Sequence, residues 1–442
     1  MQKDSVRESH ALLDWRMALE KVLAAVPTLA AEPCCIDQAV GRISAQDCIA
    51  PIEVPPFHNS AVDGYAVLAA DTAEATPGAP RRLQVVGQSR AGVPYPGELQ
   101  SGQAVEIMTG APLPQGADAV VPSEAVVAAS SGFVDILKPV RQGAAVRPAG
   151  GDTRRGDVLL RQGDVVTPGM VGKLASCGIA EIYVIREPRI AIATSGDELV
   201  EPGAAPLREG MIYDSNTPML LALYRSWGFA PQQLGRVSDT LDAVKAALGR
   251  ATEFDFFVMT GGVSVGKYDY VKQAVQDLGG EILFWRVNQQ PGKPLFVAKL
   301  QRTLFLGMPG NPVACYMCSD VYLRPALRKA RGERPPYLRV LRVETGEQIT
   351  KMDARTAFHR ANLRYLNGRF VAFVSGPPDS HILRSVTGHD GYLIVPAERA
   401  MLREGEPADF ILTSIGAAER LLLEVNQEGA GRYFEESLRA SL

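Results

Sequence analysis

The sequence predicts a multidomain protein of the α/β plus β class, in which one open α/β sheet domain lies between β-rich segments. Three observations lead to this prediction. Strands and helices alternate between residues 186 and 331, as in a parallel sheet with helices on both faces. On either side, short runs rich in Val and Ile are separated by Pro and Gly, as in small β domains. The 442 residues also exceed what one hydrophobic core usually supports.

Composition and charge narrow the class of function. Hydrophobic residues make up 46% of the chain and charged residues 21%, the balance of an ordinary globular protein. The 46 basic and 49 acidic residues leave a net charge of -3, so no broad basic surface for nucleic acid or anionic membrane is expected. The first ten residues are polar, and no later run is long and apolar enough to span a bilayer. We therefore expect a cytoplasmic protein.

The cysteines do not predict a metal site. Cys315 and Cys318 have metal-ligand spacing, but no second pair lies nearby. Because both fall in an apolar helical pattern, we predict buried thiols. The five scattered histidines do not suggest a zinc hydrolase.

The segments outside the sheet domain have their own signals. Apolar residues at spacings of three and four predict a first helix: Leu12, Trp15, Leu19, Val22 and Val26. Pro and Gly dominate from residue 51 to about 163, which predicts a small β-rich domain. After a linker at 333–336, strand-like runs predict a second β domain: 338–343, 370–374 and 392–395. From Ala417 onward no role is predicted.

Within the sheet domain, three motifs follow predicted strands. The strands are expected at 190–193, 256–259, 282–287, 295–298 and 303–306. The helices are expected from Ser215 or Asn216 to Trp227, around 241–248, at 268–278 and at 312–331. The motifs TSGDEL, GGVSVGKYDY and GMPGNP stand at strand ends, where open α/β sheets bind their ligands.

GGVSVGKYDY has the spacing of a phosphate-binding P-loop but differs from it at one position. Gly261, Gly266 and Lys267 fit, whereas Tyr268 stands where a Ser or Thr must bind magnesium. An NTPase is therefore not predicted. What remains is a glycine-rich turn whose N–H groups favour an anion, with Ser264 as an added donor. A tight turn needed only for packing is the alternative.

Cationic and anionic side chains are expected at the same strand ends. Lys293 in PGKP and Asn311 at a helix start join Ser264 as anion-binding candidates. Carboxylates follow other strands: Asp197, Glu198, Asp214 and Asp269. Since carboxylates repel a phosphate, a bridging magnesium ion would explain the combination. Alternatively, Asp197 and Asp214 cap helices.

The stretch PPFHNSAVDGYAV, residues 55–67, brings several polar side chains together. His58, Asn59, Ser60, Asp63 and Tyr65 lie within eight residues, directly after two prolines. Such residues suit a turn as well as a site, and local chemistry alone favours the turn.

Seven motifs together resemble those of a known family. PPFHNSAVDGYAV, IMTGAPLPQGADAVV, TSGDEL, IYDSNTPML, GGVSVGKYDY, PGKPL and GMPGNPV occur in the order found in the molybdopterin molybdenumtransferase family, the molybdenum insertases called MoeA in bacteria. The sequence is also similar to the E domain of gephyrin. The resemblance runs from the first helix to about residue 415.

The resemblance implies a homodimer of four-domain subunits. An N-terminal linker domain would comprise residues 1–50 and 148–185, and a β-rich domain 51–147. Residues 186–331 would form the molybdopterin-binding α/β domain, similar to molybdopterin adenylyltransferase, and 335–416 a small β-barrel. The tail, 417–442, lies outside the resemblance.

The reaction implied is the insertion of molybdate into adenylylated molybdopterin. The phosphoanhydride is cleaved with the assistance of Mg2+, AMP leaves, and the dithiolene takes the metal. Molybdopterin adenylyltransferase and molybdoenzymes are the implied transient partners.

The positions that match the motifs of the family imply the site residues. Glu198, Asp214 and Asp269 would handle the metal and the phosphoanhydride, and Ser264 and Lys293 would contact phosphate or molybdate. Further substrate contacts would come from Asp197, Ser215, Gly261, Gly262, Pro309, Gly310 and Asn311, and from Arg360 and Ser380 in the last domain. Asn59, Asp63 and Thr109 would reach the site from the partner subunit, and Asp152 matches another acidic position.

Four residues depart from the family pattern, and the resemblance implies that each replaces a group able to contact a cation or an oxyanion. His58 stands where members often have Asp, Gly151 where they have Glu, Gln290 where they have a basic residue, and Ala314 where they have Ser. We expect Lys293 to carry more of the oxyanion binding because Gln290 cannot. The departures also keep a catalytically weakened scaffold open as an alternative. A stand-alone adenylyltransferase is the other alternative, although the flanking domains do not favour it.

Overall fold

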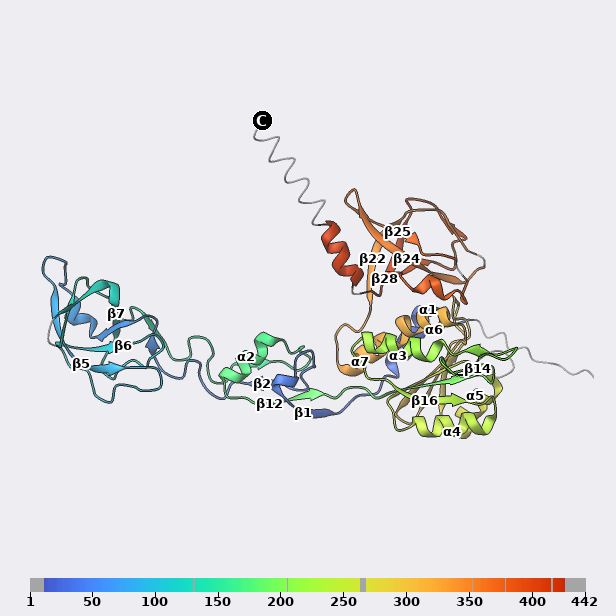
Figure 1. Ribbon diagram of the computed structural model, residues 1–442, viewed down its shortest axis with the longest axis horizontal. Coiled ribbons are helices and arrows are strands. Elements are labelled where there is room, and N and C mark those ends of the chain that lie inside the picture. Colours follow the sequence, from blue (N-terminus) through green and yellow to red (C-terminus); the bar gives the residue numbers. More distant parts are fainter. Residues whose placement is uncertain are drawn as a thin grey trace, which may run out of the picture. The chain divides into compact units, whose positions relative to one another are not determined.

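The computed structural model describes residues 12–129, 132–204, 206–262, 268–351, 353–377, 379–414 and 416–425 (Figure 1). The chain divides into two compact units. One unit is Ala31–Ile185, and the other joins the residues up to Ala30 with those from Arg186 onward. None of the helices in these ranges is long and apolar enough to cross a membrane. The finer division into four domains stays a prediction.

The unit Ala31–Ile185 holds a six-stranded sheet and a smaller part. The strand order of the sheet is β7-β4-β6-β5-β9-β8. Its strands are β4 (Gly64–Val67), β5 (Arg81–Ser89), β6 (Gln103–Ile107), β7 (Ala119–Pro122), β8 (Val126–Ala129) and β9 (Phe133–Ile136). In the smaller part, α2 (Pro168–Ser176) packs on short antiparallel pairs. These pairs are β1 (Ala31–Cys35) with β12 (Glu181–Ile185), and β2 (Cys48–Ile49) with β11 (Val158–Leu160).

The second unit contains the predicted open α/β sheet. The strand order is β16 (Gln232–Val237), β13 (Ile190–Ser195), β17 (Phe256–Thr260), β21 (Thr303–Met308), β20 (Phe296–Leu300) and β18 (Glu281–Trp285). The first four strands are parallel, and β20 runs antiparallel to both of its neighbours, β21 and β18. Only two residues separate β20 from β21, too few for the crossover that a parallel pair needs. The sheet is therefore mixed, not wholly parallel as predicted.

Helices cover both faces of this sheet, as predicted. α3 (Asn216–Ser226) and α6 (Pro312–Cys318) pack together on one face, and α4 (Leu241–Ala251) and α5 (Tyr268–Asp277) on the other (Figure 1). The helix predicted at 312–331 is interrupted by a π-helical turn, Ser319–Leu323, before α7 (Arg324–Arg331). Pro325, the second residue after that turn, has no N–H to continue the regular hydrogen bonding. Cys315 and Cys318 in this helix are fully buried, which confirms the predicted buried thiols.

A closed β-barrel follows the α/β sheet. Its strands are β22 (Arg339–Thr345), β24 (Thr356–Leu366), β25 (Arg369–Val374), β26 (Gly391–Val395) and β28 (Pro407–Leu412). The ring closes because β26 pairs with both β24 and β28. This confirms the predicted C-terminal barrel. β24 and β28 were not predicted, and residues 416–425 form a helix whose Leu421 joins the barrel core.

The first helix belongs to this second unit. α1 (Trp15–Ala24) begins at Asp14, whose carboxylate accepts the N–H of Arg16 at 2.8 Å. The indole of Trp15 packs edge-on against the ring of Phe358 in β24, with centroids 5.3 Å apart. Helix α1 is thereby held against the barrel.

Candidate functional site

A cavity of about 470 Å³ lies at the carboxyl ends of β13, β17 and β21. The parallel register brings these strand ends side by side, as expected for a ligand site in an open α/β sheet. Its lining residues are Thr194, Ser195, Gly196, Glu198, Leu199, Ile212, Asn216, Thr260, Gly261, Gly262, Pro294, Pro309, Gly310 and Asn311. Six of the predicted site residues are among them: Glu198, Gly261, Gly262, Pro309, Gly310 and Asn311.

The glycine turn after β17 fits closely against β13. Gly261 has φ +78°, and a Cβ at this position would stand 2.3 Å from the carbonyl oxygen of Ser195. Its N–H donates to the carbonyl of Met308 at 3.1 Å, which ties the turn to β21. A side chain at residue 261 would therefore push two strand ends apart, so the backbone itself forms this wall of the cavity.

Two buried polar atoms at the cavity have no hydrogen-bond partner in the described part of the chain. They are the Oγ1 of Thr260, whose side chain is fully buried, and the Oδ1 of Asn216, which is 7% exposed. The Nδ2 of Asn216 donates to the carbonyl of Gly310 at 2.7 Å and fixes the amide. Since buried polar groups normally have partners, these two atoms are candidates for contacts with a ligand.

The structure brings only some of the predicted acidic site residues to this cavity. Glu198 is exposed and lines the cavity, whereas Asp197 is exposed but does not. Asp214 accepts the N–H of Thr217 at 3.0 Å and so caps the first turn of α3, as the alternative prediction had it. Ser215 precedes α3 without a capping hydrogen bond from its side chain. Across the described residues, no group of three or more His, Cys, Asp or Glu could hold a metal ion.

Two of the predicted catalytic groups cannot be located. Ser264 lies outside the described residues, as does the side chain of Asp269, although the backbone of Asp269 belongs to α5. Their predicted roles stay predictions.

The anion-binding candidates lie in different surroundings. Lys293 is exposed and is followed by Pro294 of the cavity lining, but Lys293 itself does not line the cavity. Asn311 donates from its Nδ2 to the Oγ of Ser380 at 2.8 Å, and the N–H of Val313 donates to the carbonyl of Ser380 at 3.2 Å. One N–H group at the start of α6, where the N–H groups were expected to favour an anion, is therefore already hydrogen-bonded to the segment that carries Ser380.

Arg360 does not lie at the cavity. It is 2% exposed, and its Nη2 donates to the carbonyl of Pro377 at 2.5 Å. Burial lowers the pKa of its guanidinium. With Gln290 and Lys351 it lines a separate cavity of about 10 Å³, room for about one water molecule. In this conformation, that cavity is too small for a tetrahedral oxyanion such as molybdate.

In the other unit, Asp63 and Thr109 form a local pair. The Oδ1 of Asp63 accepts both the N–H of Thr109, at 2.7 Å, and its hydroxyl, at 2.8 Å. These hydrogen bonds lower the pKa of the Asp63 carboxyl, so the carboxylate form is favoured. Asn59 is buried, and its Oδ1 has no partner within the described ranges.

Two other positions were singled out near this pair. His58 is exposed, and its Nδ1 accepts the N–H of Ala149 at 3.3 Å. Asp152 is exposed and accepts the hydroxyl of Thr153 at 3.2 Å.

Sequence reasoning missed three polar residues of the cavity wall. Ser195, Thr260 and Asn216 all line the cavity. Ser195 and Thr260 are the last residues of β13 and β17, where the motifs that follow the strands were considered but not these strand residues, and Asn216 was considered only as a possible start of α3. The Oγ of Ser195 donates to the Oδ1 of Asp239 at 2.5 Å, a pairing that joins residues 44 positions apart.

Three family models match the chain in order. They are the MoeA N-terminal region (domains I and II) over residues 13–178, a probable molybdopterin binding domain over residues 191–329, and the MoeA C-terminal region (domain IV) over residues 342–413. The three regions together span nearly all of the described chain.

Individual proteins are similar over most of their length. The chain is 37% identical to "Molybdopterin molybdenumtransferase 2" of Mycobacterium tuberculosis over 82% of this chain and 90% of that protein. It is 34% identical to the molybdopterin molybdenumtransferase of Bacillus subtilis over 85% of this chain and 88% of that protein. A solved structure of a molybdopterin biosynthesis MoeA protein from Pyrococcus horikoshii aligns with a TM-score of 0.78 at 30% identity, covering 91% of this chain and 99% of that one.

Proposed function

The chain belongs to the molybdopterin molybdenumtransferases, the MoeA family of enzymes, and we propose that it inserts molybdate into adenylylated molybdopterin with release of AMP. The observation that carries this proposal is the cavity at the strand ends. Its volume of about 470 Å³ lies in the range of ligand sites, and its walls combine glycine turns with unpaired polar atoms.

The cavity walls suit a substrate that carries both phosphate and a heterocycle. Gly261 and Gly262 present a backbone turn that a phosphate can approach closely. The Oγ1 of Thr260 can donate a hydrogen bond, and the Oδ1 of Asn216 can accept one. A pterin or adenine ring edge presents donors and acceptors of the kind that would satisfy both atoms.

A magnesium ion is proposed to bind Glu198 at the cavity together with carboxylates assigned by matching position. This ion usually takes one or two carboxylates together with substrate phosphates, and Glu198 lines the cavity. Asp214 gives one carboxylate oxygen to the first turn of α3 and keeps the other for a ligand. Glu198, Asp214 and Asp269 would hold the ion. When bound, it would reduce the negative charge of the phosphoanhydride.

The chain's own groups would do the remaining work. Ser264 and the N–H groups of the glycine turn would orient the phosphoanhydride, and Lys293 would attract the tetrahedral molybdate. Water would cleave the phosphoanhydride into AMP and the phosphate of molybdopterin, and the dithiolene sulfurs would replace oxygen ligands of molybdate, which leave as water with the thiol protons. Asp197, Ser215, Arg360, Ser380 and Asp152 are proposed as further substrate contacts only on their matching positions.

The functional protein is proposed to be a cytoplasmic homodimer. Asn59, Asp63 and Thr109 would complete the site of the partner subunit. The carboxylate of Asp63, held in place by Thr109, has the rigidity that such a contribution requires. Molybdopterin adenylyltransferase would supply the substrate, and molybdoenzymes would receive the product.

AMP release tests the proposal directly. The purified full chain is mixed with adenylylated molybdopterin and Mg2+, with and without molybdate, and AMP is measured. We expect release that requires molybdate and falls about 100-fold in Glu198→Gln, the scale of losing one transition-state contact. The matched control is Glu201→Gln, an exposed carboxylate three positions away that does not line the cavity.

The other outcomes identify the alternatives. AMP release without molybdate would refute an insertase. Intact dimers without AMP release would support a weakened scaffold, and consumption of ATP with free molybdopterin would support an adenylyltransferase.

A further inference from the structure

A second ligand-sized cavity lies at the opposite end of α3. Its volume is about 350 Å³, and it shares no lining residue with the cavity at the strand ends. Asn216 begins α3 at the first cavity, and Trp227 ends the helix at the second. An adjoining cavity of about 390 Å³ shares Trp227, Arg324, Thr413 and Ser414 with it. We name the 350 Å³ space the arginine cavity, after Arg324, Arg328 and Arg339 in its lining.

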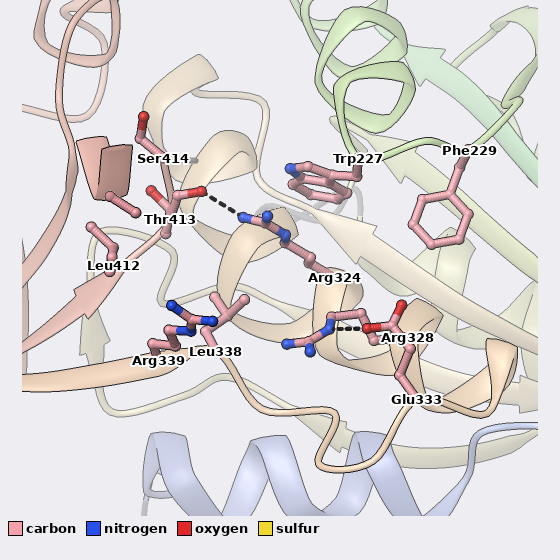
Figure 2. Close-up of a pocket in the computed structure, with 11 residues that line it drawn as sticks. Trp227, Phe229, Arg324, Arg328, Glu333, Leu338, Arg339, Leu412, Thr413 and Ser414 are labelled. Carbon is pink, nitrogen blue, oxygen red and sulfur yellow. Dashed lines mark hydrogen bonds and ion pairs between the residues drawn. The ribbon is translucent and has the colours of Figure 1, made fainter. Parts of the chain in front are cut away.

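Side chains from both the α/β sheet domain and the barrel line the arginine cavity (Figure 2). Trp227 follows α3, Arg324 belongs to α7, and Arg339 belongs to β22. Thr413 and Ser414 follow the last barrel strand, β28. The Nη1 of Arg324 donates to the carbonyl of Thr413 at 2.7 Å, which fixes this guanidinium at the wall.

The charges at the arginine cavity do not balance. Three guanidiniums line it with one carboxylate, Glu333, which pairs with the Nε of Arg328 at 2.7 Å. For Arg339, no ion pair or side-chain hydrogen bond is found among the described residues. Arg324 has Asp320 at 3.9 Å, but burial raises the pKa of that carboxyl to about 7. Near neutral pH, the cavity therefore keeps an excess of one to two positive charges by this count.

The polar groups left over are hydrogen-bond donors. The Nη1 of Arg324 is used, but a guanidinium has five N–H donors. The Oγ of Ser414 accepts the N–H of Ala417 at 3.2 Å, and among the described residues no acceptor of its hydroxyl proton is found. Figure 2 shows the indole of Trp227 beside Arg324, and no partner of its N–H is found in the described part of the chain. Such a set of donors selects an anion.

Two helix ends meet the arginine cavity. Residues 416–425 begin a helix there, with Ala418 in the lining, so the positive end of that helix dipole favours an anion. The negative end of α3 opposes this effect. However, the N–H groups of Gly228 and Phe229 already bind the last carbonyls of α3 at 2.9 and 3.1 Å. The positive side chains therefore dominate the local field.

The remaining wall is apolar. Phe229, Leu338, Leu412 and Ala418 line the cavity beside the charged groups. Arg331 covers one face of the Phe229 ring, with its Cζ 4.1 Å from the centroid. An inorganic anion would leave this surface uncovered, whereas a ligand with an apolar ring would bury it and gain affinity.

We propose that the arginine cavity binds a small organic anion in which a phosphate or carboxylate group is attached to an apolar ring. The anionic group contacts Arg324 and Arg339, and the ring packs on Leu338 and Leu412. Guanidinium groups bind both phosphate and carboxylate through paired N–H donors, so the two anions belong to one chemistry. This site goes beyond the proposed transfer reaction, because it shares no lining residue with the cavity at the strand ends.

Calorimetric titration of the full chain tests the proposal. The probes are phenyl phosphate, benzoate and inorganic phosphate. We expect saturable binding of phenyl phosphate or benzoate, and binding of inorganic phosphate that is weaker by about 10-fold, because it lacks the ring. The tighter of the two aromatic probes identifies the preferred anionic group.

Two substitutions on one strand locate the binding. Arg339→Gln removes a guanidinium that has no ion pair in the part of the chain that the structure describes. We expect about 10-fold weaker binding of the tighter probe. Arg342→Gln is the matched control, because Arg342 pairs with Asp409 at 2.8 Å and does not line the cavity. We expect less than about a 2-fold change there. Absence of saturable binding, or equal weakening by both substitutions, would overturn the proposal.

Discussion

Lys293 and Gln290 differ in the charge with which they can bind an oxyanion. Lys293 is exposed beside Pro294 of the cavity lining, while Gln290 lines the small cavity with Arg360. A neutral amide cannot replace an ammonium group in holding a dianion. The proposed molybdate binding therefore depends on a single basic side chain at this loop.

Replacement of this lysine is the first prediction. Lys293→Ala should weaken the binding of molybdate by about 10-fold, as expected for loss of one charge-assisted contact. Titration calorimetry with molybdate measures this change. Lys299→Ala removes an exposed charge on β20 that does not line the cavity and should have little effect. An unaltered affinity in Lys293→Ala would contradict the role given to this lysine.

Asp320 is an ionisable group enclosed between α6 and the barrel. It is 1% exposed, and its Oδ2 accepts the hydroxyl of Tyr392 at 2.8 Å. Burial raises the pKa of its carboxyl from 3.8 to about 7, although Arg324 and Tyr392 act in the opposite direction. The folded protein thus holds this proton more strongly than the unfolded chain does.

The direction of the pH effect follows from proton linkage. Between pH 4 and 7 the unfolded chain loses the Asp320 proton while the folded protein keeps it, so the stability falls as the pH rises. Above pH 7 the loss is complete, and it amounts to roughly 4 kcal/mol. Below pH 4 both states are protonated and the group has no effect.

Removal of this ionisation gives the second prediction. Asp320→Asn keeps an acceptor for Tyr392 but does not ionise. Relative to the original protein, the variant should gain about 3 kcal/mol of stability between pH 5 and pH 8. Scanning calorimetry at both pH values measures the shift in unfolding temperature. Equal shifts at pH 5 and pH 8 would show that Asp320 does not carry a raised pKa.

At the scale of elements, the glycine turn after β17 decides the shape of the cavity. Gly261 and Gly279 both have positive φ, +78° and +70°. A Cβ at Gly261 would stand 2.3 Å from the carbonyl oxygen of Ser195, whereas a Cβ at Gly279 would meet nothing within 4 Å. A substitution at Gly279 therefore tests backbone strain alone. A substitution at Gly261 tests backbone strain together with the close packing of β17 against β13.

The third prediction compares these two glycines. Gly279→Ala should cost about 1–2 kcal/mol through its left-handed backbone and leave ligand binding unaltered. Gly261→Ala should cost more and should also reduce AMP release, because β13 and β17 must move apart. Thermal unfolding and the AMP assay measure both effects. The prediction fails if the two variants lose stability equally and keep full AMP release.

Sequence patterns predicted the positions of most strands in the α/β sheet, but not the directions in which the strands run. The run 303–306 predicted β21, and the apolar run 295–298 predicted β20. Their antiparallel pairing follows from the two-residue connection, which the rule of alternating strands and helices did not consider. β24 was missed although it closes the barrel, because its apolar residues do not alternate along its whole length.

At the scale of the whole molecule, we propose that the site combines residues of two subunits. Glu198 belongs to the second compact unit and Asp63 to the unit Ala31–Ile185. If Asp63 reaches the site from the partner subunit, a dimer that combines an Asp63 variant with a Glu198 variant keeps one intact site.

Mixing two defective variants is the fourth prediction. Asp63→Ala and Glu198→Gln are each expected to release little AMP. After unfolding and refolding together, half of the dimers are mixed, and each mixed dimer has one intact site, so about a quarter of the original activity should return. Separate refolding of each variant is the control. Failure of the mixture to recover activity, with mixed dimers verified by mass, would contradict a site shared between subunits.

The sequence by itself determined the class of the fold, the strand ends that carry the motifs and the burial of Cys315 and Cys318. These properties depend on local periodicity and on turn residues, which a single chain segment expresses on its own. Only the tertiary structure decided which side chains meet. It buried Arg360 away from the strand ends, and it joined Trp227, Arg324 and Ser414, which are distant in the sequence, around one cavity. Such meetings depend on long-range packing between elements, and no local pattern of residues encodes that packing.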